Sequence, residues 1–408
     1  MRRTGSVLLV LAAVTAASAQ SPSPAPAPAA EWRQLYGPAR NGTAATAIAA
    51  GASLAVAWKK PMPVGGAGLA VGGDRVYTLG SDGERDFLFA MDAGTGHEAW
   101  RVPLGPTHAD AVTHGPNSTP AIEGDLVLTV SSGCLLQAIN LRTQQTAWTQ
   151  DIGATYASRF VKRGGCGMSP LVAGNRVVLM TGASKGPRLA AFDVTTGKLL
   201  WGSPELPDSF STAPGWMDVD GGLVLYHHSK PPGVSGISAI NAATGAIAWQ
   251  IDGKEGESDA TPVAVAPGRV LLETWPQVSL YDVASRTPVW TTKEVAAQRA
   301  PIISHDGHLY AFGGQSGEFL TCLETATGKV KWTSRIYRGH LVRAGNTLVV
   351  LSEASGLVRL VAADPSAYRE LARVQVLPPG ARTGTPQSVA GGRIFVRNLE
   401  ELVAVAVR

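Results

Sequence analysis

Short apolar runs separated by turns rich in glycine and aspartate recur along almost the whole chain. In the stretch Val71-Gly-Gly-Asp-Arg-Val-Tyr77, apolar residues flank a Gly-Gly-Asp turn. Runs of this kind, bounded by Gly and Asp or Asn, are typical of β-hairpins. With this one, the sequence contains eight such hairpins, and the others begin at Ile122, Val172, Val219, Val265, Ser304, Val342 and Val389.

A second hairpin, which ends in a tryptophan, follows the first in most of these units. Ala90-Met-Asp-Ala-Gly-Thr-Gly-His-Glu-Ala-Trp100 closely matches Ala191-Phe-Asp-Val-Thr-Thr-Gly-Lys-Leu-Leu-Trp201. An acidic or amide residue stands eight positions before six of the tryptophans, at Asp92, Asn140, Asp193, Asn241, Asp282 and Glu324. The tryptophans recur at intervals of 41 to 53 residues, as Trp58, Trp100, Trp148, Trp201, Trp249, Trp290 and Trp332. A period in this range indicates a repeat array or a propeller.

Two hairpins per repeat make a four-stranded sheet, and radial repetition of such sheets gives a β-propeller. We therefore predict an all-β fold, an eight-bladed β-propeller of four-stranded blades. The last unit, which starts at Val389, has room for only three strands before Arg408. Leu54-Ala-Val-Ala-Trp58 resembles the fourth strand of a unit, which ends in tryptophan, but no first three strands precede it. We expect the ring to be closed by this N-terminal strand around Trp58. The propeller then covers residues 54–408, and residues 31–53 precede it as an N-terminal extension.

The seven repeat tryptophans are interpreted as structural residues. Each ring is expected to lie flat between blades, packed on the turn glycine of a neighbour, because burying a large aromatic ring stabilises the fold by about 2–3 kcal/mol. The Asp and Asn residues are expected to cap their own turns by accepting backbone N–H bonds. The repeat therefore accounts for these residues without a binding role.

The first residues have the pattern of a secretory signal. Arg2 and Arg3 precede an apolar run and then Ala17-Ser18-Ala19, which predicts a signal peptide over residues 1–19. The apolar run is too short for a permanent membrane anchor, so no transmembrane segment is expected. Residues 20–30 are rich in Pro and Ala and are interpreted as an extended linker. No Cys lies near the cleavage position, which argues against a lipoprotein.

Composition limits the classes of function. The chain is 45% hydrophobic and only 16% charged, with 47 Gly and 27 Pro, which fits a folded, turn-rich protein and excludes a disordered one. The net charge is +4, and Arg2 and Arg3 in the predicted signal supply two of those charges. A nearly neutral mature chain gives no indication of nucleic-acid binding.

Candidate binding residues gather on one predicted face. The Thr-Gly turns between third and fourth strands are short, so the opposite face carries the long segments, above all 104–118 and 152–168. These segments and two turns between second and third strands hold His108, Asp110, His114, Asn117, Tyr156, Arg159, Lys162, Arg163, His227, His228 and Trp275. Loops on a rigid scaffold often carry binding residues, and we expect several of these side chains to share one concave region. The alternative is a solvated polar rim. No residue is assigned as catalytic.

The three cysteines are expected to form at most one internal bridge. Cys134 and Cys166 lie on the same predicted face and in neighbouring blades, so they are the predicted disulfide, whereas Cys322 falls within a buried strand. Two unpaired residues in tight loops are the alternative. No metal site is predicted, because no zinc-type spacing of His or Cys occurs, and C-x-x-C-H, the motif for covalent haem attachment, is absent.

The A-x-D-x-x-T-G-K-x-x-W units resemble the tryptophan-docking repeats of the pyrroloquinoline-quinone (PQQ)-type propeller superfamily. The segment Glu31-Trp-Arg-Gln-Leu-Tyr-Gly-Pro-Ala-Arg-Asn-Gly42 is also similar to one that precedes such propellers in many secreted bacterial chains. The superfamily includes both quinoprotein dehydrogenases and non-enzymatic scaffolds, among them the BamB-type propeller of the outer-membrane barrel-assembly machine. Fold resemblance of this kind does not by itself select between these functions.

Two readings of function remain. In the first, the chain is a secreted, non-catalytic binding or scaffold module without a cofactor, monomeric, in the bacterial periplasm or outside the cell, whose loop-rich face binds a protein or an extracellular polymer. In the second, it is a divergent PQQ-dependent alcohol or sugar dehydrogenase that also uses calcium. The resemblance implies two adjacent cysteines beside the quinone, but no two of the three cysteines in this sequence are adjacent. In addition, no Asp matches the catalytic base or the calcium ligands. These departures favour the first reading.

Overall fold

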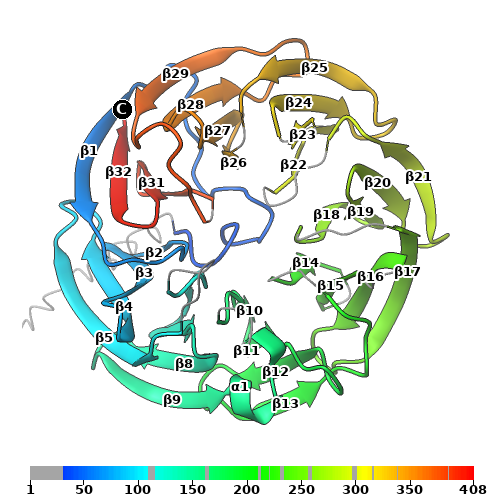
Figure 1. Cartoon of the computed structure of the whole chain (residues 1–408). Coiled ribbons are helices and arrows are strands. Elements are labelled where there is room, and N and C mark those ends of the chain that lie inside the picture. The colour runs from blue at the N-terminus through cyan, green and yellow to red at the C-terminus, as the bar shows by residue number, and fades with distance from the viewer. Residues whose placement is uncertain are drawn as a thin grey trace, which may run out of the picture.

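The computed structural model describes residues 31–408 except 109–114, 161–164, 210–212, 220, 230–233, 256–259, 296–300, 315–316, 338 and 385. Within it, eight four-stranded antiparallel sheets stand radially around one axis and form a closed ring (Figure 1). The predicted eight-bladed β-propeller is therefore confirmed. A single short helix, α1 (Ile152–Thr155), is described, in the crossover between the second and third blades.

Each of the first seven blades is built from four consecutive strands. Blade 1 has β2 (Ala70–Gly72), β3 (Arg75–Ser81), β4 (Arg85–Asp92) and β5 (Glu98–Pro106). Blade 2 has β6 (Ala121–Glu123), β7 (Leu126–Val130), β8 (Leu135–Asn140) and β9 (Gln145–Asp151). Blade 3 has β10 (Leu171–Ala173), β11 (Arg176–Met180), β12 (Leu189–Asp193) and β13 (Leu199–Gly202). Blade 4 has β14 (Gly215–Met217), β15 (Leu223–Ser229), β16 (Val234–Asn241) and β17 (Ile247–Glu255).

The remaining blades repeat this order, and the eighth differs in its outer strand. Blade 5 has β18 (Val263–Ala266), β19 (Arg269–Thr274), β20 (Gln277–Asp282) and β21 (Thr287–Thr292). Blade 6 has β22 (Ile303–His305), β23 (His308–Gly313), β24 (Phe319–Glu324) and β25 (Val330–Arg335). Blade 7 has β26 (Gly339–Ala344), β27 (Thr347–Ser352), β28 (Leu357–Ala362) and β29 (Glu370–Gln375). Blade 8 combines β30 (Ser388–Ala390), β31 (Arg393–Arg397) and β32 (Glu401–Val407) with β1 (Leu54–Pro61).

The N-terminal strand closes the ring, as expected. β1 pairs antiparallel with β32 from Leu54 opposite Val407 to Pro61 opposite Glu401. The indole Nε1 of Trp58 donates a hydrogen bond to the carbonyl of Ala93, 3.1 Å away in blade 1. One strand thus completes the sheet of blade 8 and joins blade 8 to blade 1.

The repeat tryptophans join successive blades in the same way. The indole Nε1 atoms of Trp148, Trp201, Trp290 and Trp332 donate to backbone carbonyls of the next blade at 2.8–3.0 Å. A Cβ added at Gly197 would stand 2.6 Å from the Trp148 ring, and Gly96, Gly245 and Gly328 lie equally close to their tryptophans. Trp100 packs against the cluster that contains Val127 of the next blade, and Trp249 packs against the cluster that contains Val270 of the next blade. The turn glycine is therefore needed both for its positive φ and for the room it leaves to the ring.

Residues 31–53 cross the centre of the ring (Figure 1). Trp32 exchanges two backbone hydrogen bonds with Val71 of blade 1, at 2.8 and 3.0 Å. The side chain of Gln34 accepts from the backbone N–H of Val172 in blade 3, and the backbone N–H of Ala44 donates to Arg343 in blade 7. Further contacts reach blades 2, 4, 5 and 6 through Ile122, Pro214, Thr261 and Ile303. Ser53 exchanges two backbone hydrogen bonds with Arg408, at the end of blade 8. The segment therefore contacts all eight blades, and Trp32 is only 2% exposed.

Candidate functional site

The two faces of the disc differ in what they carry. Turns between second and third strands and the crossovers between blades lie on one face, which we call the loop face. Turns between first and second strands and the Thr-Gly turns lie on the other, which we call the turn face. Among the described residues no helix is long and apolar enough to cross a membrane.

The predicted binding residues of blades 2 and 3 are only partly available to a ligand. His108 is exposed, and its backbone N–H donates to Ser132 Oγ at 2.7 Å. Asn117 and Tyr156 are half-buried, and Arg159 forms an ion pair with Asp208 at 2.8 Å. Asp110, His114, Lys162 and Arg163 lie outside the described residues, so the expected cluster of basic and histidine side chains stays a prediction.

His227 and His228 lie inside β15 rather than in the turn that follows it. Their exposed fractions are 3% and 2%. β15 pairs with β16 as far as Ser229, and His228 stands opposite Gly236, where an added Cβ would clash with the imidazole. Because successive strand residues face opposite sides, His227 lies beside Thr261 of blade 5, whereas His228 is on the same side as Tyr226, which packs with blade 3. These histidines are interior residues and not part of a surface site.

Burial changes the acid–base behaviour of both histidines. Burial lowers the pKa of His227 to about 4, helped by the neighbouring charge of His228 and opposed by the backbone of Glu273. Burial also lowers the pKa of His228, against the attraction of Asp252. Both imidazoles are therefore neutral at neutral pH.

The loop face of blades 5 to 7 carries exposed aromatic side chains. Trp275, in the turn between β19 and β20, is 44% exposed. Phe319, the first residue of β24, is 39% exposed, and Tyr337, in the crossover after β25, is 42% exposed. Since these are consecutive blades of the ring, the three side chains form an arc, which we call the aromatic arc (Trp275, Phe319 and Tyr337).

Two of the three aromatic residues are linked through Arg335. Phe319 stands directly opposite Arg335 in the β24–β25 ladder, and the Arg335 guanidinium lies 5.1 Å from the centre of the Tyr337 ring. A cation over an aromatic face orders both groups. The sequence prediction included Trp275 but not Phe319 or Tyr337, because it weighted histidines and charges; apolar residues at turns of the loop face are the signal that could have found them.

Cys134 and Cys166 are joined by a disulfide, with Cα atoms 5.1 Å apart. Cys134 follows the turn after β7, and Cys166 precedes β10, so the bridge connects blades 2 and 3 at the loop face. Cys322 is a buried free thiol in β24, and burial raises its pKa to about 11.

Replacing both Cys134 and Cys166 with Ala is expected to lower the free energy of unfolding by about 3–4 kcal/mol, because the bridge closes a loop with a sequence separation of 32. Urea unfolding with and without reductant provides the measurement. Reductant should lower the stability of the natural protein and leave the double variant unchanged. Free thiols at both positions in an unreduced tryptic digest would contradict the bridge.

One buried arginine lies at the centre of the ring, and another lies where blade 8 meets blade 1. Arg40 Nη1 and Nη2 donate to the carbonyls of Pro170 and Pro214 at 3.0 and 2.9 Å, so one guanidinium from the N-terminal segment bridges blades 3 and 4. Arg397 Nη2 donates to the carbonyl of Pro63 at 2.9 Å, and Nη1 contacts Thr78 and Leu79. Burial lowers the pKa of Arg40 to about 10 and that of Arg397 to about 9. Both cations are held by neutral oxygens, so their role is to connect blades.

Two cavities are described at the inner ends of blades 4 to 6, and both are small. One cavity, beside His227, Thr261 and Glu273, and a second, beside Tyr36 and Arg40, each measure about 10 Å³. That is room for one water, whereas sites for cofactor-sized ligands measure roughly 300–1,000 Å³. The residues that line these cavities therefore do not fit a tricyclic quinone, and within the described part of the chain no three His, Cys, Asp or Glu side chains gather as metal ligands.

Comparisons with known proteins agree with the repeat and the fold. The family model described as outer membrane protein assembly factor BamB matches residues 40–204 and 90–334. BamB of Burkholderia pseudomallei (strain K96243) is 23% identical over 341 residues, which cover 79% of this chain and 79% of that protein.

Solved structures of two kinds share the fold. BamB from Moraxella catarrhalis has a TM-score of 0.62 at 14% identity and covers 86% of this chain and 99% of its own. Quinohemoprotein alcohol dehydrogenase from Comamonas testosteroni has a TM-score of 0.68 at 13% identity, covering 92% of this chain and 80% of that one. At these identities the structural likeness shows the fold alone. The family match spans most of the propeller, and the chain therefore belongs to the β-propeller family described as outer membrane protein assembly factor BamB.

Proposed function

We propose that this protein is a non-catalytic scaffold that binds a protein partner through its loop face, with the aromatic arc as the anchor. The exposed side chains of Trp275, Phe319 and Tyr337 carry the proposal. Aromatic residues on a rigid frame supply large contact area with little loss of side-chain entropy, and they dominate the energetics of many interfaces.

Family membership supports a role beside the bacterial outer membrane. A curated relative is named as an outer membrane protein assembly factor. A partner from that assembly machinery is the occupant that fits the proposal, and the periplasm, reached through a signal peptide at residues 1–19, is its place. Arg335 at the arc favours a partner that offers acidic side chains beside apolar ones.

The alternative, a PQQ-dependent dehydrogenase, has less support. The dehydrogenase structure from Comamonas testosteroni shares the fold at 13% identity, and a likeness at this identity says nothing about the cofactor. The buried carboxylate of Asp86 accepts from Thr107 Oγ1 at 3.0 Å and from the backbone N–H of Ser132 at 2.6 Å, so it serves as a contact between blades. Incubating the protein with PQQ and Ca²⁺ tests the alternative directly, through spectra and dye reduction with alcohols or sugars.

Site-directed photo-crosslinking tests the scaffold proposal. A photoreactive amino acid placed at Trp275 or Tyr337 is expected to give a specific adduct, in bacterial cell envelopes, with a component of the outer-membrane assembly machinery. The matched control is Val289 in β21, which is 45% exposed but lies on the outer strand of blade 5.

The affinity for the identified partner then measures the contribution of the aromatic arc to binding. Trp275→Ser combined with Tyr337→Ser is expected to weaken the affinity at least about tenfold, as removal of interface anchors does, without lowering the unfolding midpoint. Equal adducts from Val289 and the arc, or an unchanged affinity of the double variant, would refute the scaffold role of this face.

A further inference from the structure

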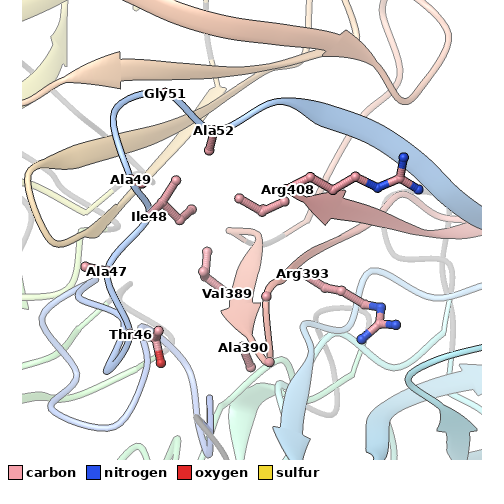
Figure 2. Close-up of a pocket in the computed structure, with 13 residues that line it drawn as sticks. Thr46, Ala47, Ile48, Ala49, Gly51, Ala52, Val389, Ala390, Arg393 and Arg408 are labelled. Atoms are coloured by element: carbon pink, nitrogen blue, oxygen red, sulfur yellow. The ribbon is translucent and has the colours of Figure 1, made fainter.

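A cavity of about 350 Å³ opens on the turn face, on the opposite side of the disc from the aromatic arc. The N-terminal segment from Thr46 to Ala52 forms one wall, and the turn after β30 together with the last residues of β32 forms the others. Ile48, Ala52 and Val389 line the same space. The side chains of Arg393 and Arg408 both leave its wall on one side and extend away from it, with their guanidinium groups apart from each other (Figure 2). The cavity thus has an apolar interior, with two cationic groups beyond one of its edges.

Arg393 stands between two cavities. It also lines a second one of about 350 Å³, which lies toward blade 1 and is bordered by Val71, Phe395 and the carboxylates of Asp74 and Asp92. Both carboxylates are already paired with Arg75. Its Nε is buried, and the side chain makes no hydrogen bond or ion pair with the residues that the structure describes. A guanidinium without a partner beside apolar space is suited to bind an anion.

Four backbone N–H groups of the cavity wall are already hydrogen-bonded. The N–H groups of Ile48 and Ala52 donate to Ala344 and Ala49, and those of Val407 and Arg408 donate to Gly392 and Ser53. A peptide laid in the cavity would bury its own N–H and C=O groups opposite a wall with few free partners, which is unfavourable. A hydrocarbon chain has no such groups.

We propose that this cavity binds a free fatty carboxylate, with the acyl chain among Ile48, Ala52 and Val389 and the carboxylate at Arg393. A volume of about 350 Å³ holds roughly ten to twelve groups of methylene size, taken as about 30 Å³ each, the share of a water in the liquid. That is one medium-length chain and not the paired chains of a membrane lipid.

Calorimetric titration of the purified protein with dodecanoate tests this site. One dodecanoate is expected to bind per chain, butanoate is expected to give no detectable heat, and dodecyltrimethylammonium is expected to bind at least about tenfold more weakly. The same chain length with opposite charge isolates the contribution of the arginines. Arg393→Gln should weaken the binding of dodecanoate about tenfold. It should also reduce the difference in affinity between dodecanoate and dodecyltrimethylammonium.

Two matched variants identify the cavity. Ala49 lines it and Ala50 does not, and both are exposed, so a large side chain at either position leaves the fold intact. Ala49→Trp is expected to abolish dodecanoate binding, and Ala50→Trp is expected to retain it. Binding that survives Ala49→Trp, equal affinity for the anionic and cationic amphiphiles, or sedimentation with phosphatidylglycerol vesicles without binding of free dodecanoate would each overturn the proposal.

Discussion

Deleting residues 31–60 is expected to prevent the protein from folding to a stable monomer. The deletion removes β1, whose pairing with β32 completes blade 8, and the Trp58 bond that joins blade 8 to blade 1. It also removes the N-terminal extension, which contacts all eight blades. The freed edge of β32 is apolar from Leu402 to Val405, and an exposed edge of this kind pairs with other chains.

Light scattering after size exclusion, together with urea unfolding, measures this effect. The truncated protein should elute as aggregate and lose its cooperative transition. Trp58→Ala is the finer variant, and it should lower the free energy of unfolding by about 3–5 kcal/mol, as removal of a buried tryptophan does. Val56→Ser, which changes an exposed side chain of the same strand, serves as the control. A monomeric truncation with the natural unfolding midpoint would show that ring closure has another origin.

The fold was predictable because its signals are local. Each hairpin carries its own turn residues, the eight first hairpins indicated the number of blades, and the short last unit indicated the missing outer strand. The indole of Trp148 bonded to Val194 is one such repeat contact, made between neighbouring units in sequence and in space. Short-range patterns of this kind are readable without knowledge of the packing.

The place of residues 31–53 was not predictable from pattern. Gln34 bonds to Val172, 138 positions away, and Thr347 bonds to Ile48, 299 positions away. No periodicity encodes such contacts, because the segment has no repeat partner and fits a space that exists only when the ring is complete. The cavity at Arg393 depends on the same segment and was missed for the same reason.

The candidate site shows where residue type misleads. His227 and His228 were expected at a turn because they are polar and lie near a loop, yet β15 continues through them and buries both rings. Gly236 on the paired strand supplies the space for the His228 ring, a cross-strand relation that sequence order does not reveal. Exposed aromatic residues, by contrast, lie at the turns between strands and on the crossovers.

Lowering the pH from 7 to about 4.5 is expected to destabilise the protein by about 2–3 kcal/mol through His227 alone. Its pKa is about 4 in the folded state, against 6.5 for the free side chain. Below pH 6.5 the unfolded chain therefore binds a proton that the folded protein does not, and stability falls as the pH drops from 6.5 toward 4. Each pH unit in that window corresponds to about 1.4 kcal/mol.

Urea unfolding at both pH values measures this dependence, with two variants that remove the imidazole. His227→Phe and His227→Gln should each lose about 2–3 kcal/mol less than the natural protein on acidification, whatever their stability at pH 7. The cavity beside His227 holds Glu273 as its other titratable group, and His228 follows in the same strand with a pKa lowered in the same direction. His97→Gln, at an exposed position, is the control and should leave the pH dependence as it is. A natural protein equally stable at both pH values would mean that β15 admits a charged His227, which requires water or a carboxylate to reach an imidazole that is 3% exposed.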